Sequence, residues 1–130
     1  MALSASLVLA ADDPAHLARF YAVLLEVQAE IGLSATHWRV PWPGGGHLEI
    51  YAPSRSRPQP RLSGRLALCL RRDAAGGDVM ARLETWIAEA TALGATAAEP
   101  SRQEPFGAEV WLLDPEGNRL LLLVASAHPR

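Results

Sequence analysis

One acidic side chain stands in a strand-like segment where it could bind a ligand or transfer a proton. Glu49 lies between Leu48 and Ile50, and its side chain therefore shares a face with His47 and Tyr51. If the two aliphatic side chains face a helix, Glu49 faces a cavity, where its carboxylate could bind a polar or cationic group or act as a base. The sequence equally allows a solvated residue on an open sheet face, or one half of a structural ion pair.

The other side chains that could do chemistry are few. The four histidines show no HExxH spacing, and the single cysteine has no partner for a CxxC motif or an intramolecular disulfide. His37 and His47 flank a glycine-rich turn and could reach the mouth of a cavity, whereas Cys69 lies in an apolar segment that predicts a buried, inert thiol. Glycines 44–46 join two strands and open no helix, so they do not fit a phosphate-binding loop. The chain has no lysine, which excludes Schiff-base chemistry by a side chain.

Length and composition point to one small globular domain. The chain has 130 residues, 49% of them hydrophobic, which is enough to bury a core without disulfides or metal ions. Its 12 basic and 14 acidic residues give a net charge of -2, so no basic excess indicates a nucleic acid or an anionic membrane surface. The longest strongly apolar run, residues 120–125, is far too short to span a bilayer. We expect a cytoplasmic protein that has no nucleic-acid or membrane partner.

The first half of the chain predicts a strand, a helix and three further strands. Residues 4–11 alternate and form the first strand, and Asp12, Asp13 and Pro14 then provide a helix cap and a proline for the first turn. A helix of about three turns follows, because apolar residues recur at three- and four-residue spacing. These residues are Leu17, Phe20, Tyr21, Leu24 and Val27. The three further strands are predicted at about residues 27–33, 36–42 and 47–52, the last two joined by PGGG.

The second half repeats this order of elements after a stretch rich in proline, serine and arginine, PSRSRPQPRLS. Asp78 or a neighbouring residue caps a helix that carries Trp86 on its apolar stripe and ends at Gly94. Strands are predicted at residues 65–70, 95–99, 108–113 and 118–124. We predict an α+β fold of two βαβββ modules, although another α+β order stays open because the halves share little sequence. The single domain spans residues 1–130, with module 1 at about 3–53, a linker at about 54–63 and module 2 at about 64–126.

Several segments together resemble a known family. In the first module they are LVLAADDPAHLARFY and GGGHLEIYAP, and in the second RLALCLRRD and FGAEVWLLDPEGNRLLLLV. The most specific piece is DPEGN before an apolar strand. These segments resemble the vicinal oxygen chelate superfamily, which includes glyoxalase I, extradiol dioxygenases, and fosfomycin- and bleomycin-resistance proteins. The resemblance covers nearly the whole chain and implies a curled mixed sheet around a central cavity, and a homodimer.

In metal-dependent members of that superfamily, the ligands lie on the first and last strand of each module. The corresponding positions of this chain are Ser6, Glu49, Arg65 and Leu121. Only Glu49 could bind a metal ion, since Leu121 offers no donor atom and Arg65 brings a permanent positive charge. The resemblance therefore implies a member without a metal or another cofactor. One hypothesis is that Arg65 pairs with Glu49 and neutralises it, and the alternative is an arginine at a strand start that reaches solvent. A shift of register by one or two residues would bring Ser4 or His47 into play.

Aromatic side chains outside the helices are further candidates for ligand contact. Trp38, Tyr51 and Trp111 could stack on a planar ligand in the cavity, although each tryptophan fits a core or a subunit interface as well. The predicted ligand-binding set is Ser6, Trp38, Glu49, Tyr51, Arg65, Trp111 and Leu121.

Three classes of function are compatible with these residues. The first is metal-independent binding of a small organic molecule, including sequestration of a drug or metabolite. The second is a lyase or isomerase that uses Glu49 with Arg65, or a dioxygenase-type enzyme of the same superfamily. The third is an interaction domain whose cavity is filled by bulky side chains. The sequence does not identify the ligand.

Overall fold

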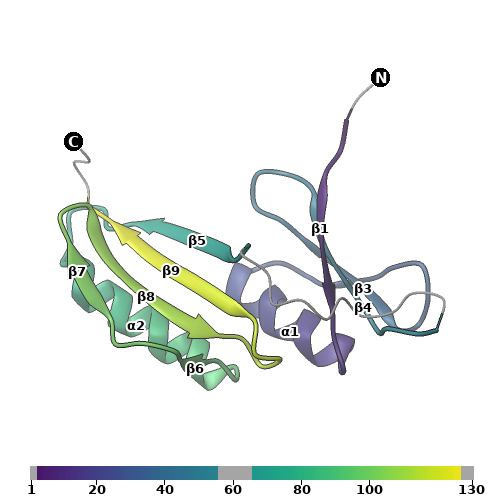
Figure 1. The fold of residues 1–130 in the computed structure, drawn as a ribbon. Coiled ribbons are helices and arrows are strands. Elements are labelled where there is room, and N and C mark those ends of the chain that lie inside the picture. The colour runs from purple at the N-terminus through teal and green to yellow at the C-terminus, as the bar shows by residue number, and fades with distance from the viewer. Residues whose placement is uncertain (1–2, 56–65, 127–130) are drawn as a thin grey trace. The chain divides into compact units, whose positions relative to one another are not determined.

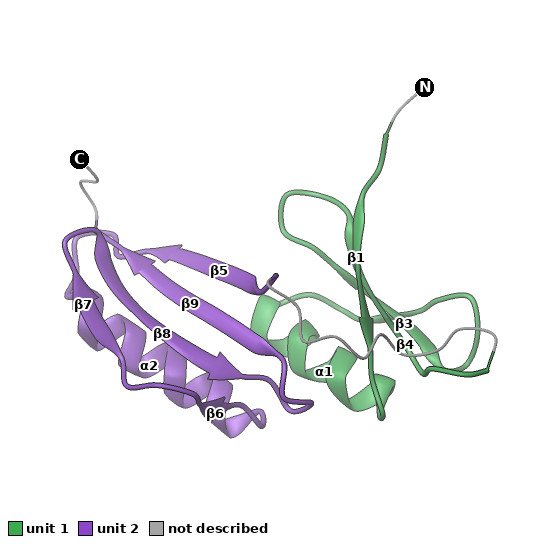
Figure 2. Ribbon diagram, viewed as in Figure 1, with its two compact units in different colours: residues 1–63 green, residues 64–130 purple. Residues whose placement is uncertain are grey.

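The computed structural model describes residues 3–55 and 66–126, and the chain divides into two compact units, residues 1–63 and 64–130 (Figure 2). Within the described residues each unit combines one helix with one mixed sheet (Figure 1). The predicted α+β fold with a repeated order of elements is confirmed. The predicted linker falls largely outside the described residues, and the central cavity expected between the modules stays a prediction.

The first unit follows the predicted order of strand, helix and three strands. Its elements are β1 (Ser6–Ala10), α1 (Pro14–Leu25), β2 (Glu30–Ile31), β3 (His37–Pro41) and β4 (His47–Tyr51). The sheet order is β1-β4-β3-β2, with β1 parallel to β4 and the other pairs antiparallel. The strand predicted at 27–33 is only two residues long, because the left-handed Glu26 caps α1 and Val27 still bonds to Ala22 of the helix.

The second unit has one strand more than predicted. Its elements are β5 (Leu68–Asp73), α2 (Val79–Ala92), β6 (Thr96–Ala97), β7 (Arg102–Glu104), β8 (Gly107–Leu113) and β9 (Arg119–Ala125). The sheet order is β5-β9-β8-β6, and β7 also pairs with β8. Strand β7 was not predicted because its three residues, Arg-Gln-Glu, carry no apolar alternation.

Helix α1 packs on one face of the first sheet and thereby decides what the other face carries. Asp13 accepts a hydrogen bond from the backbone N–H of His16 at 3.2 Å, and Pro14 is the first helical residue, as predicted. The buried side chains of this core come from α1 and from alternate positions of β3 and β4: Leu17, Phe20, Tyr21, Leu24, Val40, Leu48 and Ile50. The intervening strand residues therefore lie on the opposite side, which we call the α1-distal face.

Helix α2 covers one face of the second sheet in the same way (Figure 1). Asp78 caps it by accepting a hydrogen bond from the backbone N–H of Met80 at 3.1 Å, and Gly94 follows its end with φ of 116°. The core residues are Leu83, Trp86, Ala90, Val110, Leu112, Leu120 and Leu122. The side chains that alternate with them form the α2-distal face.

The DPEGN turn between β8 and β9 is organised by one buried carboxylate. Asp114 is 3% exposed and accepts hydrogen bonds from the backbone N–H groups of Glu116 and Asn118 and from the Asn118 side chain. Gly117 adopts φ of 86°, a conformation that glycine reaches without strain. The turn sets a register in which Trp111 lies opposite Leu121.

In the described part of the chain, neither helix has the length and apolar character needed to cross a membrane.

Candidate functional site

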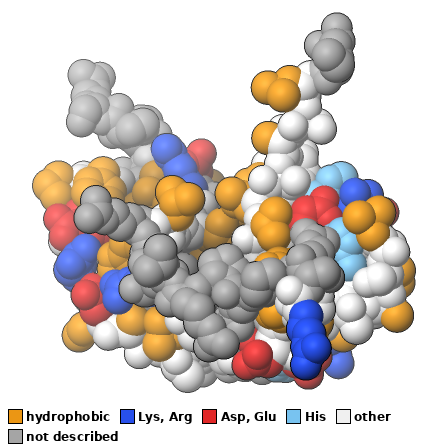
Figure 3. Space-filling view, turned by 45° about the vertical axis from the view of Figure 1, so that its right-hand side comes forward, with side chains coloured by type: hydrophobic (Ala, Val, Ile, Leu, Met, Phe, Trp, Pro, Cys, Tyr) orange, Lys and Arg blue, Asp and Glu red, His pale blue; other side chains and the backbone are white. Residues whose placement is uncertain are grey.

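Glu49 lies on the α1-distal face, as the alternation of β4 predicts. Its neighbours Leu48 and Ile50 are fully buried on the side that α1 covers, so the glutamate side chain points away from the helix. That side chain is 15% exposed, which places its carboxylate at a partly desolvated surface rather than in open solvent. Histidine, acidic and basic side chains gather together on the right-hand side of Figure 3.

Two side chains of β3 hold the Glu49 carboxylate by the same oxygen. His37 Nε2 lies 2.6 Å and Arg39 Nε lies 3.1 Å from Glu49 Oε1. The antiparallel register explains the contact, since Arg39 lies directly opposite Glu49 and both side chains share the α1-distal face. Among residues 3–55 and 66–126, Oε2 has no hydrogen-bond partner. One oxygen is thus fixed and the other is available to a ligand.

The surroundings of His37 assign the position of its proton. The ring is 7% exposed, and Nδ1 accepts a hydrogen bond from the backbone N–H of Leu33 at 2.8 Å. Nε2 therefore carries the proton and donates a hydrogen bond to Glu49. The ring also packs on Gly32, where a methyl group would lie 2.5 Å from Nδ1. His37 is a buried side chain that orients Glu49.

Glu49 is an ionised carboxylate at neutral pH. Burial raises its pKa, but the hydrogen bonds and positive charge of Arg39, together with the hydrogen bond from His37, outweigh burial and leave the pKa below its ordinary value. A carboxylate with a low pKa is a weak base, because general bases work best with a pKa near the working pH. The geometry suits an anion that binds a donor group better than one that takes up a proton.

The described residues do not fit a divalent metal ion at Glu49. The Arg39 guanidinium already occupies the neighbourhood of Oε1, and the proton on His37 Nε2 leaves that nitrogen no lone pair for a metal. Leu121, at the position where metal-dependent relatives are expected to have a ligand, offers no donor atom. Within residues 3–55 and 66–126, no three His, Cys, Asp or Glu side chains group together as metal ligands would.

Two other predicted residues of the first unit share the face of Glu49, and one does not. Ser6 is exposed and pairs with His47, and Tyr51 is the next residue of β4 on the same face. Trp38 pairs with Ile50, on the side that α1 covers, so it lies on the opposite side of the sheet from Glu49. The predicted stacking of a ligand on Trp38 beside Glu49 does not agree with this placement, because adjacent strand residues point to opposite faces.

The remaining predicted residues belong to the second unit. Leu121 pairs with Trp111 on one side and with Cys69 on the other, and all three lie on the α2-distal face. Arg119 lies over the Trp111 ring, 4.8 Å from its centroid. Arg65 lies outside the described residues, so its pairing with Glu49 stays a prediction.

Cys69 differs from its prediction as a buried thiol. It is exposed, because it lies on β5, at the edge of the sheet, and on the face that α2 does not cover. Partial burial and the Glu109 carboxylate raise the pKa of the thiol, and Arg71 only partly opposes them. The predicted lack of nucleophilic activation is consistent with this environment, since a reactive cysteine needs a lowered pKa.

The hydrogen bond between Arg39 and Glu49 was missed in the sequence, although a signal for it was present. The turn after Pro41 returns the chain at His47, which pairs with it. Counting back two residues on one strand and forward two on the other places Arg39 opposite Glu49. Fixing the hairpin register would therefore have found a cation within the same module.

Comparisons with known proteins agree with the fold and the order of motifs. A family model described as a glyoxalase-like domain matches residues 6–123. A comparison with curated protein sequences gives no match. A glyoxalase-related enzyme from Fulvimarina pelagi has a similar structure, with TM-score 0.71 and 17% identity over 95% of this chain and 88% of that chain.

Two further solved structures are similar. A glyoxalase/bleomycin resistance protein/dioxygenase family enzyme from Burkholderia phytofirmans PsJN has TM-score 0.67 and 16% identity, over 92% of this chain and 96% of that one. A lactoylglutathione lyase from Agrobacterium tumefaciens has TM-score 0.58 and 20% identity, over 97% of this chain and 93% of that one. The family match, the similar structures and the order of motifs agree, and the chain belongs to the glyoxalase-like domain family of the vicinal oxygen chelate superfamily.

Proposed function

We propose that this protein binds a small organic molecule without a metal ion, through a hydrogen-bond donor or cationic group that the molecule presents to Glu49. The observation that carries the proposal is the state of this carboxylate. It is ionised and held through Oε1 by His37 and Arg39, and its Oε2 has no partner among the described residues. Sequestration of a drug or metabolite is one form of this function.

The energetics of the site favour binding over proton transfer. A hydrogen bond to an ionised group contributes about 1.5–3 kcal/mol, enough for roughly ten- to a hundredfold in affinity. The low pKa of Glu49, in contrast, weakens it as a base. Preorganisation also favours ligand affinity. His37 fixes the carboxylate before a ligand arrives, so little side-chain entropy is lost on binding.

The neighbours of Glu49 supply apolar surface for the rest of such a molecule. Val8 lies directly across from Glu49 on β1 and is 57% exposed. Tyr51 adds part of an aromatic ring on the same face. A ligand with an apolar body and one donor group matches this combination of surface and charge. The homodimer implied by the resemblance and the cytoplasmic location expected from the composition of the chain belong to the same proposal.

An enzyme of the same superfamily is the second candidate. A buried histidine that orients a carboxylate also occurs where the carboxylate acts as a base, and one of the similar structures is a lactoylglutathione lyase. In this version Glu49 takes a proton from the substrate despite its low pKa, and Arg65 assists it.

The test compares the wild type with Glu49→Gln and Glu49→Ala. We expect purified wild-type protein to hold no stoichiometric metal, and benzamidine to bind it at least tenfold more tightly than it binds Glu49→Gln in calorimetry. Arg71→Gln, a change on β5 of the second unit, is the control and should bind benzamidine like the wild type. Stoichiometric metal that is lost in Glu49→Ala would overturn metal independence. Turnover of lactoylglutathione by the wild type, abolished in Glu49→Gln, would establish the enzyme instead.

A further inference from the structure

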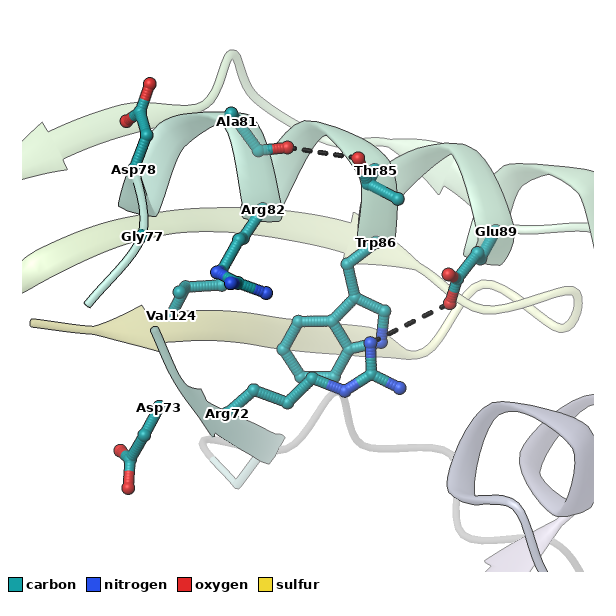
Figure 4. Close-up of a pocket in the computed structure, with 10 residues that line it drawn as sticks. All are labelled: Arg72, Asp73, Gly77, Asp78, Ala81, Arg82, Thr85, Trp86, Glu89 and Val124. Carbon is teal, nitrogen blue, oxygen red and sulfur yellow. Dashed lines mark hydrogen bonds and ion pairs between the residues drawn. The ribbon is translucent and has the colours of Figure 1, made fainter. Parts of the chain in front are cut away.

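A second surface of the protein has the features of a ligand site, and it lies on the helix side of the second unit. A groove of about 480 Å³ runs between the edge strand β5 and helix α2 (Figure 4). It is on the opposite side of its sheet from Leu121 and Trp111, because Arg72 and Val124 of its wall alternate with the residues of the α2-distal face. All of the residues that line the groove belong to the second unit.

The floor of the groove is a stacked pair of flat groups. The Arg72 guanidinium lies over the Trp86 ring, 4.4 Å from its centroid, and pairs with Glu89 of α2 at 3.7 Å. Figure 4 shows the guanidinium across the indole with Glu89 at its edge. Because the ring beneath it and the carboxylate beside it both orient Arg72, its outer surface is a preorganised cationic platform. A planar molecule can stack on that surface.

Two donor groups of the groove have no partner among the described residues. The Arg82 guanidinium makes no hydrogen bond or ion pair to any residue in 3–55 or 66–126 and projects from α2 over the groove (Figure 4). Trp86 is 3% exposed, and its buried Nε1–H has no acceptor there. Unpaired buried donors are costly, and an acceptor brought to them recovers that cost. The indole N–H of Trp86 is a buried donor of this kind, whereas the Arg82 guanidinium is exposed and offers its N–H groups to an acceptor that enters the groove.

The acidic side chains of the groove are already engaged. Asp78 caps α2 through the Met80 N–H at 3.1 Å, and Asp73 accepts a hydrogen bond from Arg71 at 3.2 Å. Glu89 pairs with Arg72. Each carboxylate of the groove thus has a hydrogen-bond or ion-pair partner, whereas the Arg82 guanidinium has none among the described residues and is the charged donor that an acceptor entering the groove would meet.

We propose that the groove between β5 and α2 binds a small aromatic carboxylate, whose ring stacks on the Arg72 guanidinium and whose carboxylate accepts hydrogen bonds from Arg82. This ligand is an anion, whereas the one proposed for Glu49 presents a hydrogen-bond donor or a cationic group. Gly77 contributes to the geometry, because a methyl group there would lie 2.6 Å from Arg82 Nε and push the side chain aside.

The test is a titration of ¹⁵N-labelled full-length protein with 2-naphthoate, followed by NMR. The Trp86 indole N–H signal is assigned by its loss in Trp86→Phe. We expect 2-naphthoate to shift this signal and the amides of α2, with a Kd in the millimolar range or tighter. Arg82→Gln should weaken binding at least tenfold. Arg82 is exposed, so its replacement leaves the core of the unit unchanged.

Matched controls separate this site from general attraction to positive charge. Arg119→Gln changes the charge equally on the α2-distal face of the second unit and should bind 2-naphthoate like the wild type. The neutral 2-naphthylmethanol should bind at least tenfold more weakly than 2-naphthoate, and Glu49→Gln should leave 2-naphthoate binding unchanged. The proposal is overturned if 2-naphthoate at about ten times a millimolar Kd shifts no groove signal, if the alcohol binds as tightly as 2-naphthoate, or if Arg119→Gln and Arg82→Gln weaken binding alike.

Discussion

The two units share an order of elements but carry opposite chemistry at equivalent positions. Glu49 is the third residue of β4 and Leu121 the third residue of β9, and each strand pairs in parallel with the first strand of its unit. Around Glu49 the neighbouring strand supplies His37 and Arg39. Around Leu121 the neighbouring strands supply Trp111 and Cys69.

This difference shows that a partly buried carboxylate is found where neighbouring residues provide hydrogen-bond donors or positive charge for it. Partly desolvating a carboxylate is unfavourable unless hydrogen bonds or opposite charge compensate. The first unit provides both from β3, whereas the second unit fills the same position with an aliphatic side chain and needs neither. The same position of the repeated scaffold thus holds a carboxylate in the first unit and an aliphatic side chain in the second, and a ligand with a donor group selects the first.

The largest effect is expected for His37→Leu, which removes the orienting group of the charged face. The Leu33 N–H loses its acceptor and Glu49 loses a donor, so the free energy of unfolding should fall by about 2–3 kcal/mol. Urea denaturation measures it. His16→Leu, at an exposed position of α1, is the control and should change stability by less than about 0.5 kcal/mol. Equal losses in both variants would contradict the role of His37.

A smaller effect is expected when the second unit is given the carboxylate of the first. Leu121→Glu places a carboxylate between Trp111 and Cys69, neither of which carries a positive charge, and should lower stability at neutral pH by about 1–2 kcal/mol. Desolvation would hold the pKa of the new carboxyl above its ordinary value, so the loss should grow as pH rises through that ordinary value. Denaturation of Leu121→Glu and Leu121→Met between pH 4 and 8 tests the trend, and a pH-independent difference between them would count against it.

Glu49→Gln should show the opposite dependence on pH. Because the folded-state pKa of Glu49 is lowered, its ionisation stabilises the fold above the unfolded-state pKa of about 4.3, and this contribution is lost as pH falls through the folded-state pKa. The stability difference between wild type and Glu49→Gln should therefore shrink in acid.

Arg39→Gln should raise the Glu49 pKa in a carboxyl-carbon NMR titration. An unchanged titration would show that Arg39 does not hold the carboxylate.

The smallest effect is expected on the α2-distal face. Arg119→Gln removes the cation over Trp111, and an exposed contact of this kind contributes about 0.5–1 kcal/mol. Thermal unfolding should detect only a slight decrease in Tm. In a Trp111→Leu background, Arg119→Gln should no longer lower Tm, because the ring beneath the guanidinium is gone. A loss as large as that of His37→Leu would mean that the charge of the second unit matters as much as that of the first.

Much of the fold follows from local patterns in the chain. Asp13, Pro14 and Asp78 mark the starts of both helices, and the DPEGN turn marks the last hairpin, because caps and turns depend on a few adjacent residues. Strand β7 escaped prediction because it is polar and is held only by pairing with β8. The short β2 was predicted too long because the helix cap continues through Val27.

The sequence by itself determined the repeated α+β order and the face on which Glu49 lies, since strand alternation depends on neighbouring residues alone. The tertiary structure decided which side chains meet that carboxylate. His37 and Arg39 reach it through the register of a hairpin, and the tautomer of His37 depends on a backbone N–H donated from Leu33. It also placed Trp38 beneath α1, away from Glu49, and brought Arg72, Arg82 and Trp86 to one groove. These contacts join residues from different elements, and only packing brings such residues together.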